Sequence, residues 1–139
     1  MRIKEIDVSR LFGLFDHSVP MKMSDRVTII TSPNGYGKTT ILRMVASLAA
    51  GRYSELRKIP FRDFRISFDD SHLLQIIRVD APREGRPSAG GDLALTLFRG
   101  NKKEDQATLP ALPADALTIP QHMIERTIPF LSKIGPSLW

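Results

Sequence analysis

The spacing of apolar and polar positions divides the first half of the chain into short elements. Apolar side chains recur through residues 2–8 and again at every second position from Val19 to Met23, which predicts two strands of an opening hairpin. Pro20 has no N–H to donate to a strand ladder, so the second strand is expected at a sheet edge. The β-branched run 27–31 has almost no polar alternation, and it predicts a strand buried on both faces.

A helix is predicted next, from about Lys38 to Ala50. Its apolar residues fall at three- and four-residue spacings and form one stripe, and Gly51 stands where a left-handed helix end is expected. From residue 61 the period changes to two, and three alternating runs up to residue 99 predict an antiparallel meander. The segment 100–118 shows no regular pattern, whereas Thr118, Pro120 and Gly135-Pro136 delimit an expected helix that Pro129 should kink or break.

Composition restricts the class of protein. A length of 139 residues allows one domain or part of a larger one, and there is no apolar run of about 18 residues, so we expect no membrane span. Polar residues interrupt every apolar stretch at the N-terminus, which argues against a signal peptide and favours the cytoplasm. The chain contains no cysteine, which excludes disulfides and thiolate metal sites within it.

The formal charge of +5 permits an anionic partner without requiring one. A solvated surface is the ordinary interpretation of the basic residues, and a nucleic-acid patch is the alternative. The positive side chains gather in three regions, at Arg52, Arg57, Lys58, Arg62 and Arg65, at Arg83 and Arg86, and at Lys102 and Lys103.

The strongest chemical signal is a glycine loop between the predicted strand 27–31 and the predicted helix. In the pattern G-x-x-x-x-G-K-[ST], backbone amides surround phosphates, the lysine reaches the β- and γ-phosphates, and the hydroxyl binds Mg²⁺. The motif's first glycine is replaced here by a serine. The candidate nucleotide-binding residues are Ser32, Pro33, Asn34, Gly35, Tyr36, Gly37, Lys38, Thr39 and Thr40, with Thr39 also the candidate magnesium ligand. The alternative interpretation is a glycine turn that merely joins two elements.

The spelling Pro33-Asn34-Gly35-Tyr36-Gly37-Lys38-Thr39-Thr40 resembles the ATP-binding-cassette branch of the P-loop ATPases. The segment 6–23, with Leu-Phe-Gly-Leu-Phe-Asp at 11–16, resembles the opening hairpin of the SMC, RecF and OLD-like ATPases. The resemblance covers residues 1–51 well and the strands of 61–99 loosely. It implies an α/β fold, a P-loop NTPase core with an antiparallel β subdomain. Residues 1–139 would then be the N-terminal part of one ATPase head, with 100–139 irregular and then helical.

The same resemblance implies ATP and Mg²⁺ as ligands and a homodimer of heads that encloses the nucleotide. DNA or an effector protein is a further candidate partner, in DNA maintenance or prokaryotic defence. The hairpin arginine of the family does not carry over, because Phe12 occupies its place. Phe12 could stack on adenine, although such an aromatic side chain more often belongs to a core.

The hydrolytic part of the family pattern is missing from the chain. Residues 76–80 imitate the acidic strand poorly because Arg78 interrupts them, 88–92 imitate the signature loop poorly, and the three histidines are isolated. We therefore expect ATP binding without efficient hydrolysis, and no catalytic residue in this chain. A complete non-hydrolytic nucleotide-binding module is the alternative, and a small phosphotransferase is a third hypothesis.

Overall fold

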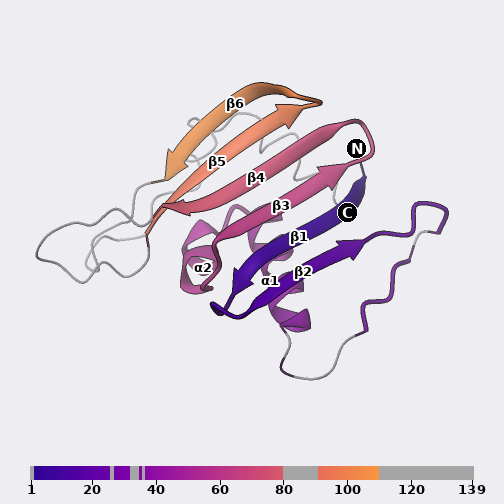
Figure 1. Cartoon of the computed structure of the whole chain (residues 1–139), viewed down its shortest axis with the longest axis horizontal. Helices are drawn as coiled ribbons and strands as arrows, with labels where there is room; N and C mark the ends of the chain where they lie inside the picture. Colours follow the sequence, from indigo (N-terminus) through magenta and orange to yellow (C-terminus); the bar gives the residue numbers. More distant parts are fainter. Residues whose placement is uncertain (1, 26, 32–34, 36, 80–90, 110–139) are drawn as a thin grey trace, which may run out of the picture.

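One antiparallel sheet dominates the computed structural model, which describes residues 2–25, 27–31, 35, 37–79 and 91–109 (Figure 1). Its strands lie in the order β2-β1-β3-β4-β5-β6, and each neighbouring pair is antiparallel. Their bounds are β1 (Ile3–Leu11), β2 (Phe15–Pro20), β3 (Asp63–Phe68), β4 (His72–Val79), β5 (Asp92–Arg99) and β6 (Lys102–Leu109).

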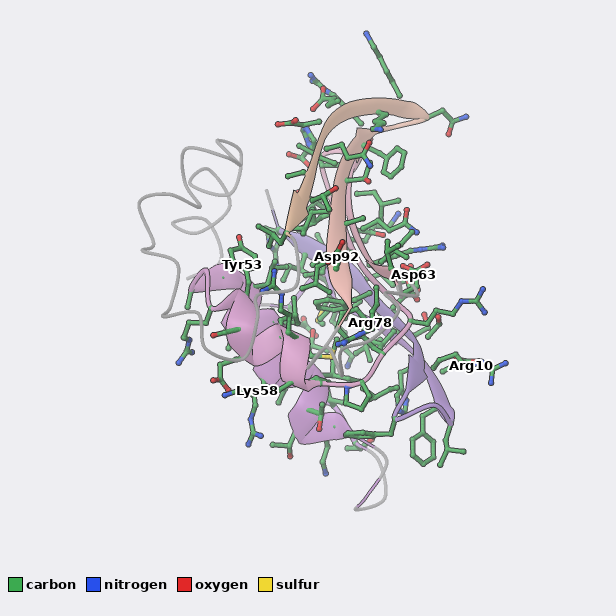
Figure 2. The ribbon with its side chains drawn as sticks, turned by 90° about the vertical axis from the view of Figure 1, so that its left-hand side faces the viewer. Arg10, Tyr53, Lys58, Asp63, Arg78 and Asp92 are labelled. Atoms are coloured by element: carbon green, nitrogen blue, oxygen red, sulfur yellow. The ribbon has the colours of Figure 1, made fainter. Side chains whose placement is uncertain are left out.

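Two helices, α1 (Lys38–Ala49) and α2 (Tyr53–Lys58), cover one face of this sheet (Figures 1 and 2). Because side chains alternate across a strand, one residue in two points toward the helices. A row of paired residues runs across five strands on that side, from Val8 through Phe64, Ile76 and Leu95 to Ala107, and all five side chains are buried.

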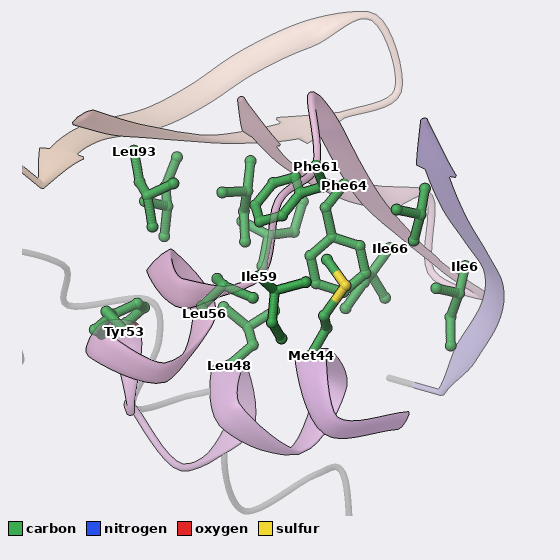
Figure 3. Close-up of a cluster of buried hydrophobic side chains, with 14 of the residues drawn as sticks. Ile6, Met44, Leu48, Tyr53, Leu56, Ile59, Phe61, Phe64, Ile66 and Leu93 are labelled. Carbon is green, nitrogen blue, oxygen red and sulfur yellow. The ribbon is translucent and has the colours of Figure 1, made fainter. Parts of the chain in front are cut away.

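Met44 and Leu48 from α1 and Leu56 from α2 close the core from the helix side (Figure 3). All three side chains are almost completely buried. Met44 and Leu48 lie one turn apart on the apolar stripe of α1, and Leu56 comes from the neighbouring helix. The core therefore lies between a single sheet and a single helical layer.

The junction between the helices confirms the predicted helix end. Gly51 has a φ of 67°, its N–H donates to Leu48 O at 3.1 Å, and the N–H of Arg52 donates to Ser47 O at 2.8 Å. This pair of bonds is a Schellman motif, which satisfies carbonyls at the end of α1 and turns the chain into α2.

The predicted α/β fold is wrong, because the structure is mainly β. Residues 27–31, expected as a strand buried on both faces, belong to no strand, and Val27 and Ile29 are 68% and 80% exposed. Every strand pairing in the described residues is antiparallel, and both helices lie on the same face. A run of β-branched residues indicates only a preference for extended backbone. A strand is buried on both faces only if other elements pack on both, and residues 27–31 have no such neighbours here.

The antiparallel meander predicted for 61–99 is confirmed as β3, β4 and β5. It is not a separate subdomain, however, because β1 pairs with β3 and joins the opening hairpin to the same sheet. β2 is an edge strand as expected but lies earlier than predicted, at Phe15–Pro20, and neither β6 nor α2 was predicted. The helix expected after Thr118 lies outside the described residues.

Candidate phosphate-binding site

The described part of the glycine loop leads directly into α1. Gly35 and Gly37 have φ values of 91° and 88°, in the left-handed region that glycine adopts without steric strain. The helix begins at Lys38, as predicted, so Lys38, Thr39 and Thr40 form its first turn. Ser32, Pro33, Asn34 and Tyr36, the other predicted site residues, lie outside the described residues.

The start of α1 has the electrostatic character of an anion site. Gly37 is the N-cap and supplies no side-chain cap, and the first turn contains no acidic residue. The first N–H groups of an α-helix have no intrahelical acceptor, and the helix dipole is positive at this end. Thr39 is exposed and Lys38 and Thr40 are half-buried, so a ligand can approach the first turn of α1 and the Thr39 hydroxyl from solvent.

The turn between β1 and β2 packs against this loop. A Cβ built on Gly37 would lie 2.5 Å from Cδ2 of Leu11 and 3.7 Å from Cε2 of Phe12. Arg10 and Phe12 have positive φ values of 53° and 54°, which are uncommon for residues other than glycine. The N–H of Phe12 donates to Pro60 O at 2.8 Å, and the N–H of Arg10 donates to Asp16 Oδ1 at 2.8 Å, so both strained residues are tied to their surroundings.

Phe12 is not a core residue, contrary to the more common interpretation of such an aromatic side chain. It is 44% exposed, and its ring lies beside Gly37. Gly37 consequently has a packing function that is independent of any ligand, since a side chain at this position would collide with the turn.

A pocket of about 330 Å³ lies beside Lys38. Its walls come from residues 17–20 of β2, from the extended segment 28–31, and from Lys38 and Ile41 of α1. His17, Ser18, Thr28, Thr31 and Lys38 give it polar groups. From the sequence, we expected His17 to be isolated. The alternation of Phe15, His17 and Val19 along β2 is the pattern that could have placed His17 on the helix-facing side.

A second hollow, of about 400 Å³, lies around residues of β1, β2 and β3, where Asp7, Asp16, Asp63 and Arg65 contribute charges. Asp63 is already paired there, because it accepts hydrogen bonds from Arg65 at 2.6 Å and from Gln75 at 3.1 Å. Within the described ranges, no three carboxylate or imidazole groups are arranged to hold a metal ion.

Residues 76–79, which resemble the acidic strand of the family only poorly, belong to the antiparallel meander, as the alternating pattern predicted. Arg78 lies on β4 opposite Leu93, at a helix-facing position (Figure 2). Its Nη2 donates to the carbonyl oxygens of Arg57 at 2.8 Å and Ile59 at 2.6 Å, and its guanidinium lies 5.2 Å from the centre of the Phe61 ring. Arg78 thus ties the end of α2 to the sheet, and Asp80 lies outside the described residues.

Comparison with known proteins identifies no family for this chain. No protein-family model matches the sequence, and no curated protein shows significant similarity to it. Neither of the two described helices combines the length and the hydrophobicity of a membrane-crossing segment.

Proposed function

We propose that this chain binds the triphosphate of ATP, together with Mg²⁺, at the N-terminus of α1. The observation that carries the proposal is the succession of two glycines at positive φ and a helix whose first two residues are Lys38 and Thr39. In the phosphate-loop pattern, a glycine loop followed by a lysine and a threonine at a helix start surrounds a chain of phosphates with backbone amides, an ammonium group and a hydroxyl.

Each group has a separate role in the proposal. The glycine-loop amides and the first turn of α1 bind phosphate oxygens, and Lys38 neutralises the β- and γ-phosphates. Thr39 contributes its hydroxyl to Mg²⁺. A single protein ligand fits this ion, because Mg²⁺ usually keeps several waters and takes its remaining ligands from the substrate phosphates. The exposed position of Thr39 is compatible with that role.

The preference for ATP and the pairing of two copies around the nucleotide come from the resemblance to the SMC, RecF and OLD-like ATPases. The cytoplasmic location comes from the polar residues that interrupt every apolar stretch at the N-terminus. In this proposal the chain binds ATP without hydrolysing it efficiently, because the acidic and signature motifs are missing from its sequence. The formal charge of +5 favours DNA as a partner, and DNA binding should weaken steeply as the salt concentration rises.

The proposal is tested by titrating the chain with a fluorescent ATP analogue in the presence of Mg²⁺. Lys38→Ala should weaken binding about tenfold or more, since it removes a charged contact worth about 1.5–3 kcal/mol. Lys4→Ala is the matched control, because Lys4 is an exposed lysine of β1 away from the loop. The affinity of this variant for the ATP analogue should equal that of the wild type. Equal affinities for the wild type and Lys38→Ala would overturn the proposal.

A further inference from the structure

The helical layer carries most of the excess positive charge of the chain. From Lys38 to Lys58 there are five basic residues and a single acidic residue, Glu55, a net charge of +4 compared with +5 for all 139 residues. Because α1 and α2 make up most of this stretch, the excess charge is concentrated on one layer of the fold.

The fold divides the basic region that the sequence indicated at residues 52–65. Arg65 lies on the other face of the sheet, where it donates to Asp63 at 2.6 Å. Arg57 is half-buried, whereas Arg52 and Lys58 are exposed. They are joined by Arg43, which is exposed on the side of α1 opposite its buried stripe. Figure 2 shows Lys58 on the outer side of the helices.

These three exposed cations surround one carboxylate. Lys58 Nζ donates to Glu55 Oε1 at 2.8 Å, and this hydrogen bond is the largest cause of a lowered pKa at the Glu55 carboxyl. The positive charges of Arg52 and Arg43 lower the same pKa, so both guanidinium groups lie near this carboxylate too. A single carboxylate cannot neutralise three cations, and the group keeps a net positive charge.

The opposite face of the sheet carries acidic groups. Val8 and Phe64 face the helices, so their neighbours Asp7 and Asp63 face away from them, and both line the hollow of about 400 Å³. Figure 2 shows Asp63 on the side of the sheet away from the helices. The field of the protein therefore orients a polyanion toward the helical layer and away from β1 and β3.

The residue types of the helical layer favour the phosphate backbone of a duplex. Single strands are held by exposed aromatic side chains that stack on the bases, and Tyr53, the one aromatic residue of the two fully described helices, is 4% exposed. A helix that lies on a lipid surface presents a row of large apolar side chains, whereas Leu42 is the single exposed large hydrophobic residue of α1 and α2.

We propose that the outer surface of α1 and α2, formed by Arg43, Arg52 and Lys58, binds the phosphate backbone of duplex DNA without reading its sequence. This inference rests on the proposed function, which names DNA as a partner, and it adds the surface that makes the contact. Lys38 is not part of this surface, because the start of α1 is assigned to ATP. The two anionic ligands would thus occupy different parts of the same helical layer.

The test measures the anisotropy of a fluorescein-labelled DNA duplex of about 30 base pairs between about 50 and 200 mM salt. The triple variant Arg43→Gln/Arg52→Gln/Lys58→Gln should bind at least about tenfold more weakly at 100 mM salt, and its affinity should depend less steeply on salt, by about 2–3 units of slope on logarithmic axes. It should bind the ATP analogue as the wild type does, since Lys38 is unchanged.

The matched control removes the same number of charges elsewhere. Lys4→Gln/Arg99→Gln/Lys102→Gln changes three exposed residues of β1, β5 and β6, and its DNA affinity should stay within about twofold of the wild type. Glu55→Gln removes the carboxylate from the middle of the surface and should strengthen DNA binding about two- to fourfold. A structural role of these side chains alone would not produce that gain.

The outcomes separate the surface from the nucleotide site. Equal losses of DNA affinity in the triple variant and its control would show that net charge matters rather than this surface, and would overturn the inference. If the wild type does not bind the duplex at 50 mM salt, the inference fails with the DNA partner, while the ATP titration of Lys38→Ala still decides the nucleotide site. Should the triple variant not fold, Glu55→Gln decides, and an unchanged DNA affinity would overturn the inference.

Discussion

Gly37 and Leu11 are in such close contact that a single added carbon at Gly37 would lie 2.5 Å from Leu11 Cδ2. Gly37, which belongs to the proposed phosphate loop, is thus also needed for the helix start to pack on the β1–β2 turn. A loss of nucleotide binding in a Gly37 variant would not by itself identify a phosphate contact, and Lys38 is the better test position.

Gly37→Ala should destabilise the fold by about 2–5 kcal/mol. The added Cβ combines a left-handed backbone conformation, which costs an L-residue about 1–2 kcal/mol, with overpacking against a fully buried side chain, which costs about 1–3 kcal/mol. Urea denaturation of both proteins measures the difference. Gly35→Ala is the matched control: its φ is 91° but its Cβ would meet nothing within 4 Å, so only about 1–2 kcal/mol should be lost.

The contact itself can be isolated with a double variant. Leu11→Val shortens the side chain that meets Gly37, so it should be less destabilising in the Gly37→Ala protein than in the wild type. Additive changes in the free energy of unfolding would contradict a collision between these two residues.

Arg78→Met should lower the free energy of unfolding by about 2–3 kcal/mol. The methionine keeps an apolar stem against Phe61 but cannot donate to the carbonyls of Arg57 and Ile59, which then lose charged hydrogen bonds at the end of α2. Arg99→Met is the control, because the Arg99 guanidinium is exposed and 3.9 Å from Glu104, and it should change stability by no more than about 0.5 kcal/mol. Similar denaturation midpoints for the two variants would contradict the role of Arg78.

Tyr53 makes the free energy of unfolding depend on pH in the alkaline range. Burial raises the pKa of its phenol well above the ordinary value near 10, because the ionised form cannot be solvated in the core. Above about pH 10 the unfolded chain loses the Tyr53 proton while the folded chain keeps it, so the folded state binds more protons and stability falls as pH rises.

Tyr53→Phe should remove this part of the alkaline loss, and the two stability curves should diverge only above about pH 10. Denaturation between pH 8 and 11.5 provides the measurement, and lysine titration, which is common to both proteins, cancels in the difference. Parallel curves over the whole interval would show that the Tyr53 phenol ionises as readily in the folded state as in the unfolded one.

The exposure of residue 29 distinguishes the observed fold from the predicted one. Ile29→Ala should change the free energy of unfolding by no more than about 0.5 kcal/mol, since its side chain is 80% exposed. Ile66→Ala, the same substitution at a core position of β3, should cost about 2–5 kcal/mol. Equal costs at the two positions would mean that residues 27–31 are buried as a strand.

The sequence predicted the elements better than their arrangement. Alternation identified β3, β4 and β5, and the stripe through Met44 and Leu48 identified α1, because each pattern is local and follows from the geometry of its element. It could not reveal that β1 pairs with β3 rather than leading into a parallel core, since that pairing joins residues far apart in the chain. The short α2 and the highly charged β6 were missed because a six-residue helix and an exposed edge strand need little apolar patterning.

The residues of the proposed site follow from the sequence in the same uneven way. Gly35, Gly37, Lys38 and Thr39 follow one another in the chain, so their spacing alone brought them together. His17 enters the pocket only because β2 runs past the start of α1, and Arg78 has no local pattern that would indicate its carbonyl partners.

The pairing of β1 with β3 also governs the order in which the protein can fold during synthesis. Ile3 has its partner at Phe68, so the nascent chain must grow by about 65 further residues before Ile3 acquires that neighbour, which takes several seconds at about 5–20 residues per second. During that interval the apolar side of the first hairpin has no complete β3 beside it. The N-terminal hairpin therefore stays without its β3 neighbour until the chain has grown past residue 68.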